Sequence, residues 1–300
     1  MTGILNKLFG RHEKSFIPEI PTDPLNEEQQ PEPFPVDQRT HLEPPQLLTG
    51  CAQSVGKQRD HNEDALFILT TNLASDKTHS SFGLYIVADG MGGHRNGEIA
   101  SSIAVRSLAN HVVRKLYTSL LSPQPASPSQ PLQEILLAAI QEAQQTILKE
   151  VPGGGTTLTA AILLGEQVTI AHVGDSRAYL VSPSGDMQVL TRDHTLVKRL
   201  VELGQITTEE AAIHPQRNVL YRALGQGEPV EPDISTSPMA HSSYLLLCSD
   251  GLWGVVPEKE LARIILAAPN LEQACHRMVE AANAAGGPDN ITAVLVRMPD

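Results

Sequence analysis

Six carboxylates in this sequence stand beside the ends of short apolar runs. Asp89 follows the run at residues 84–88, Asp175 and Asp250 follow two further runs, and the other three acids come just before apolar runs. Such runs are typical of buried strands. In an antiparallel sheet the end of one strand and the start of its neighbour share an edge, so we expect the six side chains to meet at one rim. They are Glu63, Asp64, Asp89, Asp175, Asp250 and Asp289.

A cluster of this kind points to bound metal ions. Carboxylates held close together repel one another strongly unless cations lie between them. Ligands made of carboxylate oxygen suit Mg²⁺ or Mn²⁺ and disfavour zinc, for which the sequence has no cluster of His and Cys. Taken alone, Asp89-Gly90 is more typical of a tight turn in which the aspartate caps the next helix. The recurrence of the pattern at Asp175 and Asp250 favours the metal site.

Arg59 lies five residues before Asp64 and so belongs near the same rim. Its planar guanidinium suits an anion held against bound metal, although an ordinary surface arginine has the same sequence signature. The glycine-rich stretch at residues 151–157 lacks the lysine of a phosphate-binding loop, and we interpret it as a turn into a strand at 157–164. No cysteine stands in a Cys-x5-Arg loop, which argues against a cysteinyl-phosphate route.

Composition limits the remaining classes of function. A net charge of −12 argues against a general nucleic-acid binder. No apolar run approaches the ~20 residues of a membrane span, and no signal-peptide pattern opens the sequence. The three cysteines are far apart, which is typical of buried thiols in a reducing cytoplasm. Eight of the 22 prolines fall within residues 1–49, so we expect a disordered tail at 1–48 and a folded domain at 49–300.

The order of the expected elements favours helices packed on antiparallel sheets. Two helices in succession, flanked by strands on both sides, argue against alternating βαβ units. Residues 192–225 are polar and contain several arginines, which predicts an insert at the sheet edge that either faces an anionic substrate or is simply solvated. Three expected strands follow one another as hairpins: 157–164, 168–173 and 177–181. The other expected strands are 65–69, 84–88, 244–249 and 291–297. The expected helices are 97–117, about 132–147, one that begins at Pro257, and 271–285.

Seven short motifs, in order, resemble those of the metal-dependent serine/threonine protein phosphatases (protein phosphatase 2C type, PPM). Each motif is weak alone, but together they cover about residues 50–297 and make the match specific. They are Arg59…Asn62-Glu63-Asp64, Asp89-Gly90-Met91-Gly92-Gly93-His94, Gly155-Thr156-Thr157, Gly174-Asp175-Ser176-Arg177, Asp193-His194, Ser249-Asp250-Gly251-Leu252 and Gly287…Asp289-Asn290-Ile291-Thr292. The resemblance implies an α+β fold: a four-layer αββα sandwich of two antiparallel sheets flanked by helices, with a flap at about 192–225.

The resemblance also implies roles for individual residues. Asp89 matches the ligand that bridges two metal ions, and the carbonyl of Gly90 completes the shell of one of them. Asp250 and Asp289 match ligands of one ion. Four further roles follow from the motifs: Glu63 as a carboxylate of the other ion, largely through water, Asp64 as an acid behind the ligands, Asp175 with Asp250 as a weaker third site, and Arg59 as the phosphate-binding arginine.

One motif position departs from much of the family. Met91 resembles the bacterial branch, whereas animal and plant relatives usually have a histidine that has been assigned as general acid. The proton donor is therefore open, and the role does not transfer to His94.

The resemblance implies hydrolysis of phosphoserine and phosphothreonine in proteins by a water that two Mn²⁺ or Mg²⁺ ions activate. We expect a monomeric, cytoplasmic signalling enzyme with no nucleic-acid partner and no membrane insertion, acting on the products of a serine/threonine kinase pathway. Two alternatives are a partner-docking pseudophosphatase and a phosphatase of small phosphoesters. The pseudophosphatase is disfavoured because no metal carboxylate is lost.

Overall fold

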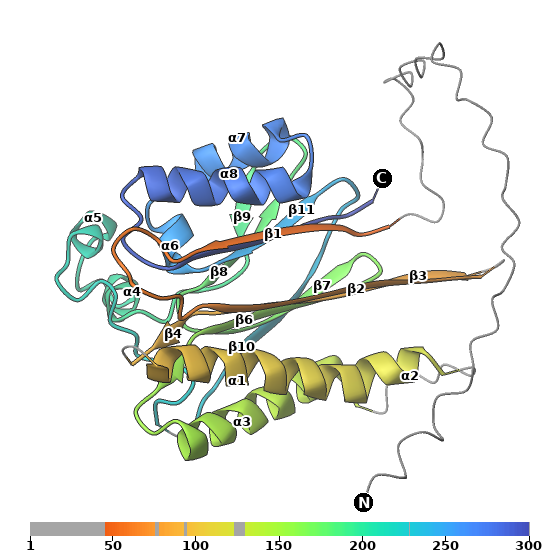
Figure 1. Ribbon diagram of the computed structural model, residues 1–300, viewed down its shortest axis with the longest axis horizontal. Helices are drawn as coiled ribbons and strands as arrows, with labels where there is room; N and C mark the ends of the chain where they lie inside the picture. Colours follow the sequence, from red (N-terminus) through yellow and green to blue (C-terminus); the bar gives the residue numbers. More distant parts are fainter. Residues whose placement is uncertain (1–45, 76–77, 93–94, 123–129, 228, 300) are drawn as a thin grey trace, which may run out of the picture. The chain divides into compact units, whose positions relative to one another are not determined.

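Two five-stranded antiparallel sheets face each other in the computed structural model (Figure 1). The model describes residues 46–75, 78–92, 95–122, 130–227 and 229–299, which all belong to the unit formed by residues 41–300. The first sheet has the order β1 (Leu48–Ser54), β12 (Ile291–Arg297), β11 (Tyr244–Cys248), β8 (Arg177–Val181) and β9 (Met187–Val189). The second has the order β10 (Asp233–Pro238), β7 (Gln167–Val173), β6 (Leu158–Leu164), β3 (Thr78–Ala88) and β2 (Ala65–Ser75).

Helices cover the outer face of each sheet, which confirms the predicted four-layer sandwich (Figure 1). α1 (Arg95–Val112) runs on through η2 (Val113–Tyr117) and α2 (Thr118–Leu120), and lies with α3 (Leu132–Glu150) on the second sheet. α7 (Glu258–Ala267) and α8 (Leu271–Ala284) cover the first sheet. The shorter elements are the ribbon of β4 (Gly90–Met91) with β5 (Gly155–Thr156), the flap helices α4 (Leu196–Glu202) and α5 (Thr208–Ala212), and α6 (Asp250–Trp253).

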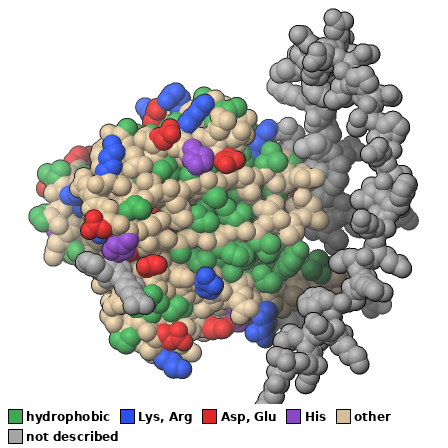
Figure 2. All heavy atoms as spheres, viewed as in Figure 1, with side chains coloured by type: hydrophobic (Ala, Val, Ile, Leu, Met, Phe, Trp, Pro, Cys, Tyr) green, Lys and Arg blue, Asp and Glu red, His purple; other side chains and the backbone are tan. Residues whose placement is uncertain are grey.

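The apolar runs of the central strands are buried on both faces, which is why they lack an alternating pattern. In β3, Leu84 and Ile86 pack among α1 and α3, whereas Tyr85 and Val87 pack between the two sheets. Successive side chains of a strand point to opposite faces, so a strand between two apolar layers must be apolar throughout. In Figure 2, hydrophobic side chains gather along the middle of the visible face, and most charged ones lie over the helix layers.

One expected hairpin is wrong. Residues 168–173 and 177–181 form β7 and β8, but the two strands belong to different sheets, and β8 pairs with β11 and β9 instead. The turn between them is held from outside. The amide of Gly174 donates to Nδ1 of His194 (3.0 Å), and its carbonyl accepts from the His194 amide (2.7 Å). These hydrogen bonds to the flap pair the amide and the carbonyl of Gly174, at the point where the chain crosses from one sheet to the other.

β1 begins at Leu48, and Leu47 is already buried between the sheets, close to the expected boundary between tail and domain. Of the expected tail at residues 1–48, residues 1–45 lie outside the described residues. In the described ranges, no helix has the length and apolar character needed to cross a membrane.

His172 on β7 makes stability depend on pH. Its ring is buried, with Nδ1 2.9 Å from Oγ1 of Thr159 and Nε2 3.1 Å from the carbonyl of Arg192. Burial, followed by the nearby His194, lowers the pKa of His172 from 6.5 to about 4. The unfolded chain therefore binds a proton more readily, and the free energy of unfolding falls as pH drops from about 6.5 toward 4.

We predict that His172→Asn flattens this acid dependence. One proton contributes a slope of at most about 1.4 kcal/mol per pH unit. Urea unfolding of both proteins at pH 7, 6, 5 and 4 measures that slope. The matched control is His241→Asn, which removes an exposed histidine from the surface. Equal slopes for wild type and His172→Asn would contradict the assignment.

Candidate active site

The pairing of strands brings the sequence-predicted acids to one end of the sandwich. Because neighbouring strands are antiparallel, acids that follow one strand lie beside acids that precede the next. This end carries the labels β4 and α6 in Figure 1. The pairs nearest the acids are Ala65 with Ala88, Leu158 with Val173, Cys248 with Arg177, and Cys248 with Ala293.

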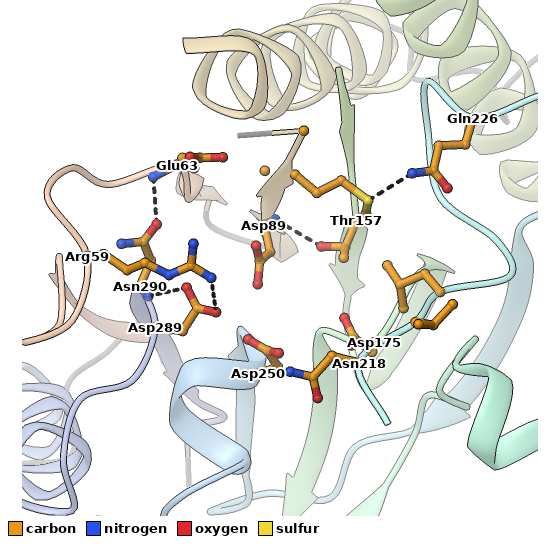
Figure 3. Close-up of a pocket in the computed structure, with 15 residues that line it drawn as sticks. Arg59, Glu63, Asp89, Thr157, Asp175, Asn218, Gln226, Asp250, Asp289 and Asn290 are labelled. Atoms are coloured by element: carbon orange, nitrogen blue, oxygen red, sulfur yellow. Dashed lines mark hydrogen bonds and ion pairs between the residues drawn. The ribbon is translucent and has the colours of Figure 1, made fainter. Parts of the chain in front are cut away.

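A cavity of about 530 Å³ opens at this end (Figure 3). Seven of the eight residues with an expected role line it, and Asp64 is buried behind them. The seven are Arg59, Glu63, Asp89, Gly90, Asp175, Asp250 and Asp289.

Asp64 is tied to the strands behind the cavity. Its Oδ2 accepts hydrogen bonds from Oγ of Ser249 (2.8 Å) and Oγ1 of Thr292 (2.6 Å). Its Oδ1 is buried and has no hydrogen-bond partner among the described residues. Burial is the main cause that raises the pKa of Asp64 to about 7, and the two hydroxyl bonds oppose it. Asp64 thus joins the chain before β2 to the ends of β11 and β12.

The backbone of Asp89 is held on both sides by two threonines. Its amide donates to Oγ1 of Thr157 (2.9 Å), and its carbonyl accepts from Oγ1 of Thr156 (2.9 Å) and from the Thr157 amide (2.8 Å). Sequence reasoning treated these threonines only as part of a turn. Their signal was the motif Gly155-Thr156-Thr157, but nothing in the sequence said what the hydroxyls bind.

Glu63 sits where the Asp89 loop meets the start of α1. Its carbonyl accepts from Oγ of Ser101 (2.6 Å), and its amide donates to Oδ1 of Asn290 (2.8 Å). Gly90 must be glycine here, because an added Cβ would lie 2.3 Å from the carbonyl oxygen of Gly97 and 2.6 Å from that of Glu63. This close approach fixes the distance between the Asp89 loop and Glu63.

Asn290 belongs to the last motif, which assigns it no role, and its side chain binds the backbone at three places. Besides accepting from Glu63, its side-chain amide donates to the carbonyls of Val55 and His61, both at 2.9 Å. It is 5% exposed and so holds the loop at residues 55–63 from inside the protein.

The carboxylates of the cavity are poorly neutralised by the chain itself. The pKa values of Asp89 and Asp175 lie well above the ordinary range, because of burial first and neighbouring carboxylates second. The same two causes raise the pKa of Asp250 to about 6. Oδ1 of Asp250 is buried without a hydrogen-bond partner in the described part of the chain. Unpaired carboxylate oxygens of this kind fit hard divalent cations.

The described side chains alone do not enclose an ion. No group of three or more His, Cys, Asp and Glu in the described ranges is placed so that it could hold a metal by itself. Mg²⁺ usually keeps several of its waters and takes only one or two protein carboxylates, so acids that do not close around an ion by themselves still suit it.

Arg59 lines the cavity and contacts the cluster directly. Its Nη2 donates to Oδ2 of Asp289 at 2.8 Å, and the side chain is 51% exposed. This hydrogen bond is the main cause that raises the pKa of Arg59. The guanidinium therefore lies where an anion beside the carboxylates would bind.

The flap contributes to the opposite wall, though not as expected. Asn218, Val219 and Leu220 line the cavity, with Gln226 just beyond the flap. No basic residue of the flap lines the cavity. Three of the basic residues pair with acids instead: Arg192 and Arg199 with Glu202, and Arg222 with Asp233. Of the two alternatives for residues 192–225, basic side chains that face a substrate are not found at this cavity. The five basic residues are Arg192, Lys198, Arg199, Arg217 and Arg222.

Comparison with known proteins agrees with the fold and with the family that the motifs resemble. The family model for "Protein phosphatase 2C" matches residues 50–291. The "Serine/threonine phosphatase stp" of Listeria innocua is 41% identical over 247 residues, which cover 80% of this chain and 92% of that protein. The crystal structure of the Mycobacterium tuberculosis serine/threonine phosphatase PstP/Ppp has a TM-score of 0.70 at 32% identity, covering 85% of this chain and 100% of that one.

A second structure is that of the PstP catalytic domain in complex with two manganese ions. Its TM-score is 0.67 at 31% identity, covering 85% of this chain and 99% of that chain. The family match, the relatives and the shared fold together place this chain in the protein phosphatase 2C family of serine/threonine protein phosphatases.

Proposed function

We propose that the carboxylates of the cavity hold two Mn²⁺ or Mg²⁺ ions for the hydrolysis of phosphoserine and phosphothreonine in proteins. The observation that carries this proposal is the convergence of acids at one cavity, where Asp64 and Asp250 each keep a buried, unpaired oxygen and the pKa values of Asp89 and Asp250 are raised. A related catalytic domain has been solved with two manganese ions, which supports the choice of metal. Two such ions supply Lewis acidity that makes a water a strong nucleophile toward the phosphoester.

The proposed ligand roles are those that the resemblance to the family implies. Asp89, at the centre of the cavity, would hold both ions, and the carbonyl of Gly90 would contribute to one of them. Asp250 and Asp289 serve one ion and Glu63 the other. Asp64 acts from behind, as its hydroxyl partners and burial suggest. Asp175 with Asp250 forms a weaker third site.

The remaining residues bind and orient the substrate. Arg59 presents N–H donors to the phosphate oxygens while its bond to Asp289 fixes the plane of the guanidinium. Met91 has no proton to donate, so the leaving oxygen takes its proton from another group. We further propose that the substrates are phosphoproteins made by a serine/threonine kinase in the cytoplasm, where the three free cysteines would stay reduced.

We predict that Asp89→Asn lowers turnover of a small phosphoester by at least ~10²-fold, a loss of roughly 2.7 kcal/mol in transition-state stabilisation. The fold should survive, because the change also removes one of several repelling charges. Steady-state kinetics at saturating Mn²⁺ and thermal unfolding measure the two effects. Asp186→Asn, an exposed aspartate away from the cavity, is the control. Near wild-type turnover in Asp89→Asn would contradict the two-metal assignment.

For Arg59→Ala we expect KM for a phosphoester to rise roughly 10- to 100-fold, the value of a charge-assisted hydrogen-bonding group. Mn²⁺ affinity should change little, because no ligand is altered. Arg59→Lys keeps the charge without the planar guanidinium, so its KM should lie between those of wild type and Arg59→Ala. Calorimetry decides the alternative: lost Mn²⁺ binding with an unaltered KM would make Arg59 a structural partner of Asp289.

A further inference from the structure

The cavity wall away from Arg59 carries a side-chain amide that the catalytic scheme does not use. Gln226 is exposed at this wall, and its Nε2 donates to Sδ of Met91 at 3.2 Å (Figure 3). A thioether is a weak acceptor, so this contact is easily exchanged for a stronger one. Within the described residues, Oε1 of Gln226 has no hydrogen-bond partner. The amide therefore has both a donor and an acceptor to offer a ligand.

A buried glutamine on α3 holds the backbone on both sides of Gln226. Oε1 of Gln144 accepts from the amide of Gly225 (2.7 Å), and its Nε2 donates to the carbonyl of Gly227 (2.5 Å). Gln144 is only 3% exposed, yet both ends of its amide are paired. Gly225 has φ +81°, and an added Cβ would lie 2.3 Å from the carbonyl oxygen of Gly154. The loop is thus clamped in one conformation.

The same loop is joined to the catalytic aspartate through a narrow ribbon. Leu224 exchanges two backbone hydrogen bonds with Thr156, at 2.9 and 3.0 Å. Thr156 in turn pairs with Gly90 and binds the carbonyl of Asp89. Gln226 is therefore held at a fixed place relative to Asp89, as a specificity residue must be.

The size and chemistry of the cavity indicate what Gln226 would meet. A volume of about 530 Å³ is ample for a phosphoseryl side chain together with the adjoining main chain. A phosphate bound between Arg59 and the carboxylates leaves the rest of the substrate to extend toward the other wall. A carboxamide there matches the C=O and N–H of a peptide group, which a small aryl ester lacks.

We propose that Gln226 is a specificity-determining residue that hydrogen-bonds the main chain of a phosphoprotein beside the phosphorylated residue, and that Gln144 is its positioning residue. This inference rests on the proposed phosphatase function of the same cavity. It explains why a residue outside the catalytic cluster is braced so firmly.

The test compares two substrates, a phosphothreonine peptide and p-nitrophenyl phosphate, with the full chain and Mn²⁺. In Gln226→Ala the ratio of kcat/KM on the peptide to kcat/KM on p-nitrophenyl phosphate should fall about fivefold or more, as expected for a lost hydrogen bond. The loss should appear in KM for the peptide. An unchanged ratio would overturn the proposal. If wild type hydrolyses neither substrate, the phosphatase function itself fails, which is a distinct result.

Variants of Gln144 test its role as the positioning residue. Gln144→Leu should lower the same ratio although it does not touch the cavity. Gln145→Leu alters an exposed neighbour on the same helix and should leave the ratio unchanged. If Gln144→Leu lowers only the melting temperature, its role is structural and the positioning claim is rejected. Should Gln144→Leu not fold, Gln226→Ala still decides the specificity claim.

Discussion

Mutual repulsion among carboxylates at one end of the sandwich is the constraint on which the rest of the structure depends. Asp89, Asp175 and Asp250 each have a raised pKa, and neighbouring acids contribute to every one of these shifts. Without cations, such a cluster costs folding free energy. The fold must therefore hold the acids together by other means, and the cations proposed for this site would offset a repulsion built into the chain.

The fold holds these acids in place mostly through hydrogen bonds to the backbone of their loops, and less through bonds to the carboxylates themselves. Thr156 and Thr157 hold the Asp89 loop, and Asn290 holds the loop that precedes β2. Side chains that grip backbone leave the carboxylate oxygens free for ligands. The hydroxyls that bind Asp64 and the ring of His61 beside Glu63 are exceptions. Arg59 is another, because its guanidinium contacts Asp289 directly. That contact neutralises one acid while leaving the arginine at the cavity.

Much of this architecture is predictable from the sequence because strands buried on both faces give continuous apolar runs. The run at residues 84–88 located β3, and the acids at the ends of such runs located the cavity wall. Long-range contacts were not predictable. The crossing from β7 to β8 depends on bonds to His194, and the hold of Gln144 on Gly225 and Gly227 joins positions about 80 residues apart. The partners of the flap arginines were not predictable either, because a positive charge in the sequence does not reveal its acidic partner.

The most direct test of the central claim is a calorimetric titration of Mn²⁺ into the chelator-treated full chain, with thermal unfolding followed at the same concentrations. If the acids of the cavity form a two-ion site, close to two ions should bind per chain, with any third much weaker. The melting temperature should rise with free Mn²⁺, because ions that bind only the folded state stabilise it. Absence of binding, or binding that leaves the melting temperature unchanged, would contradict the account.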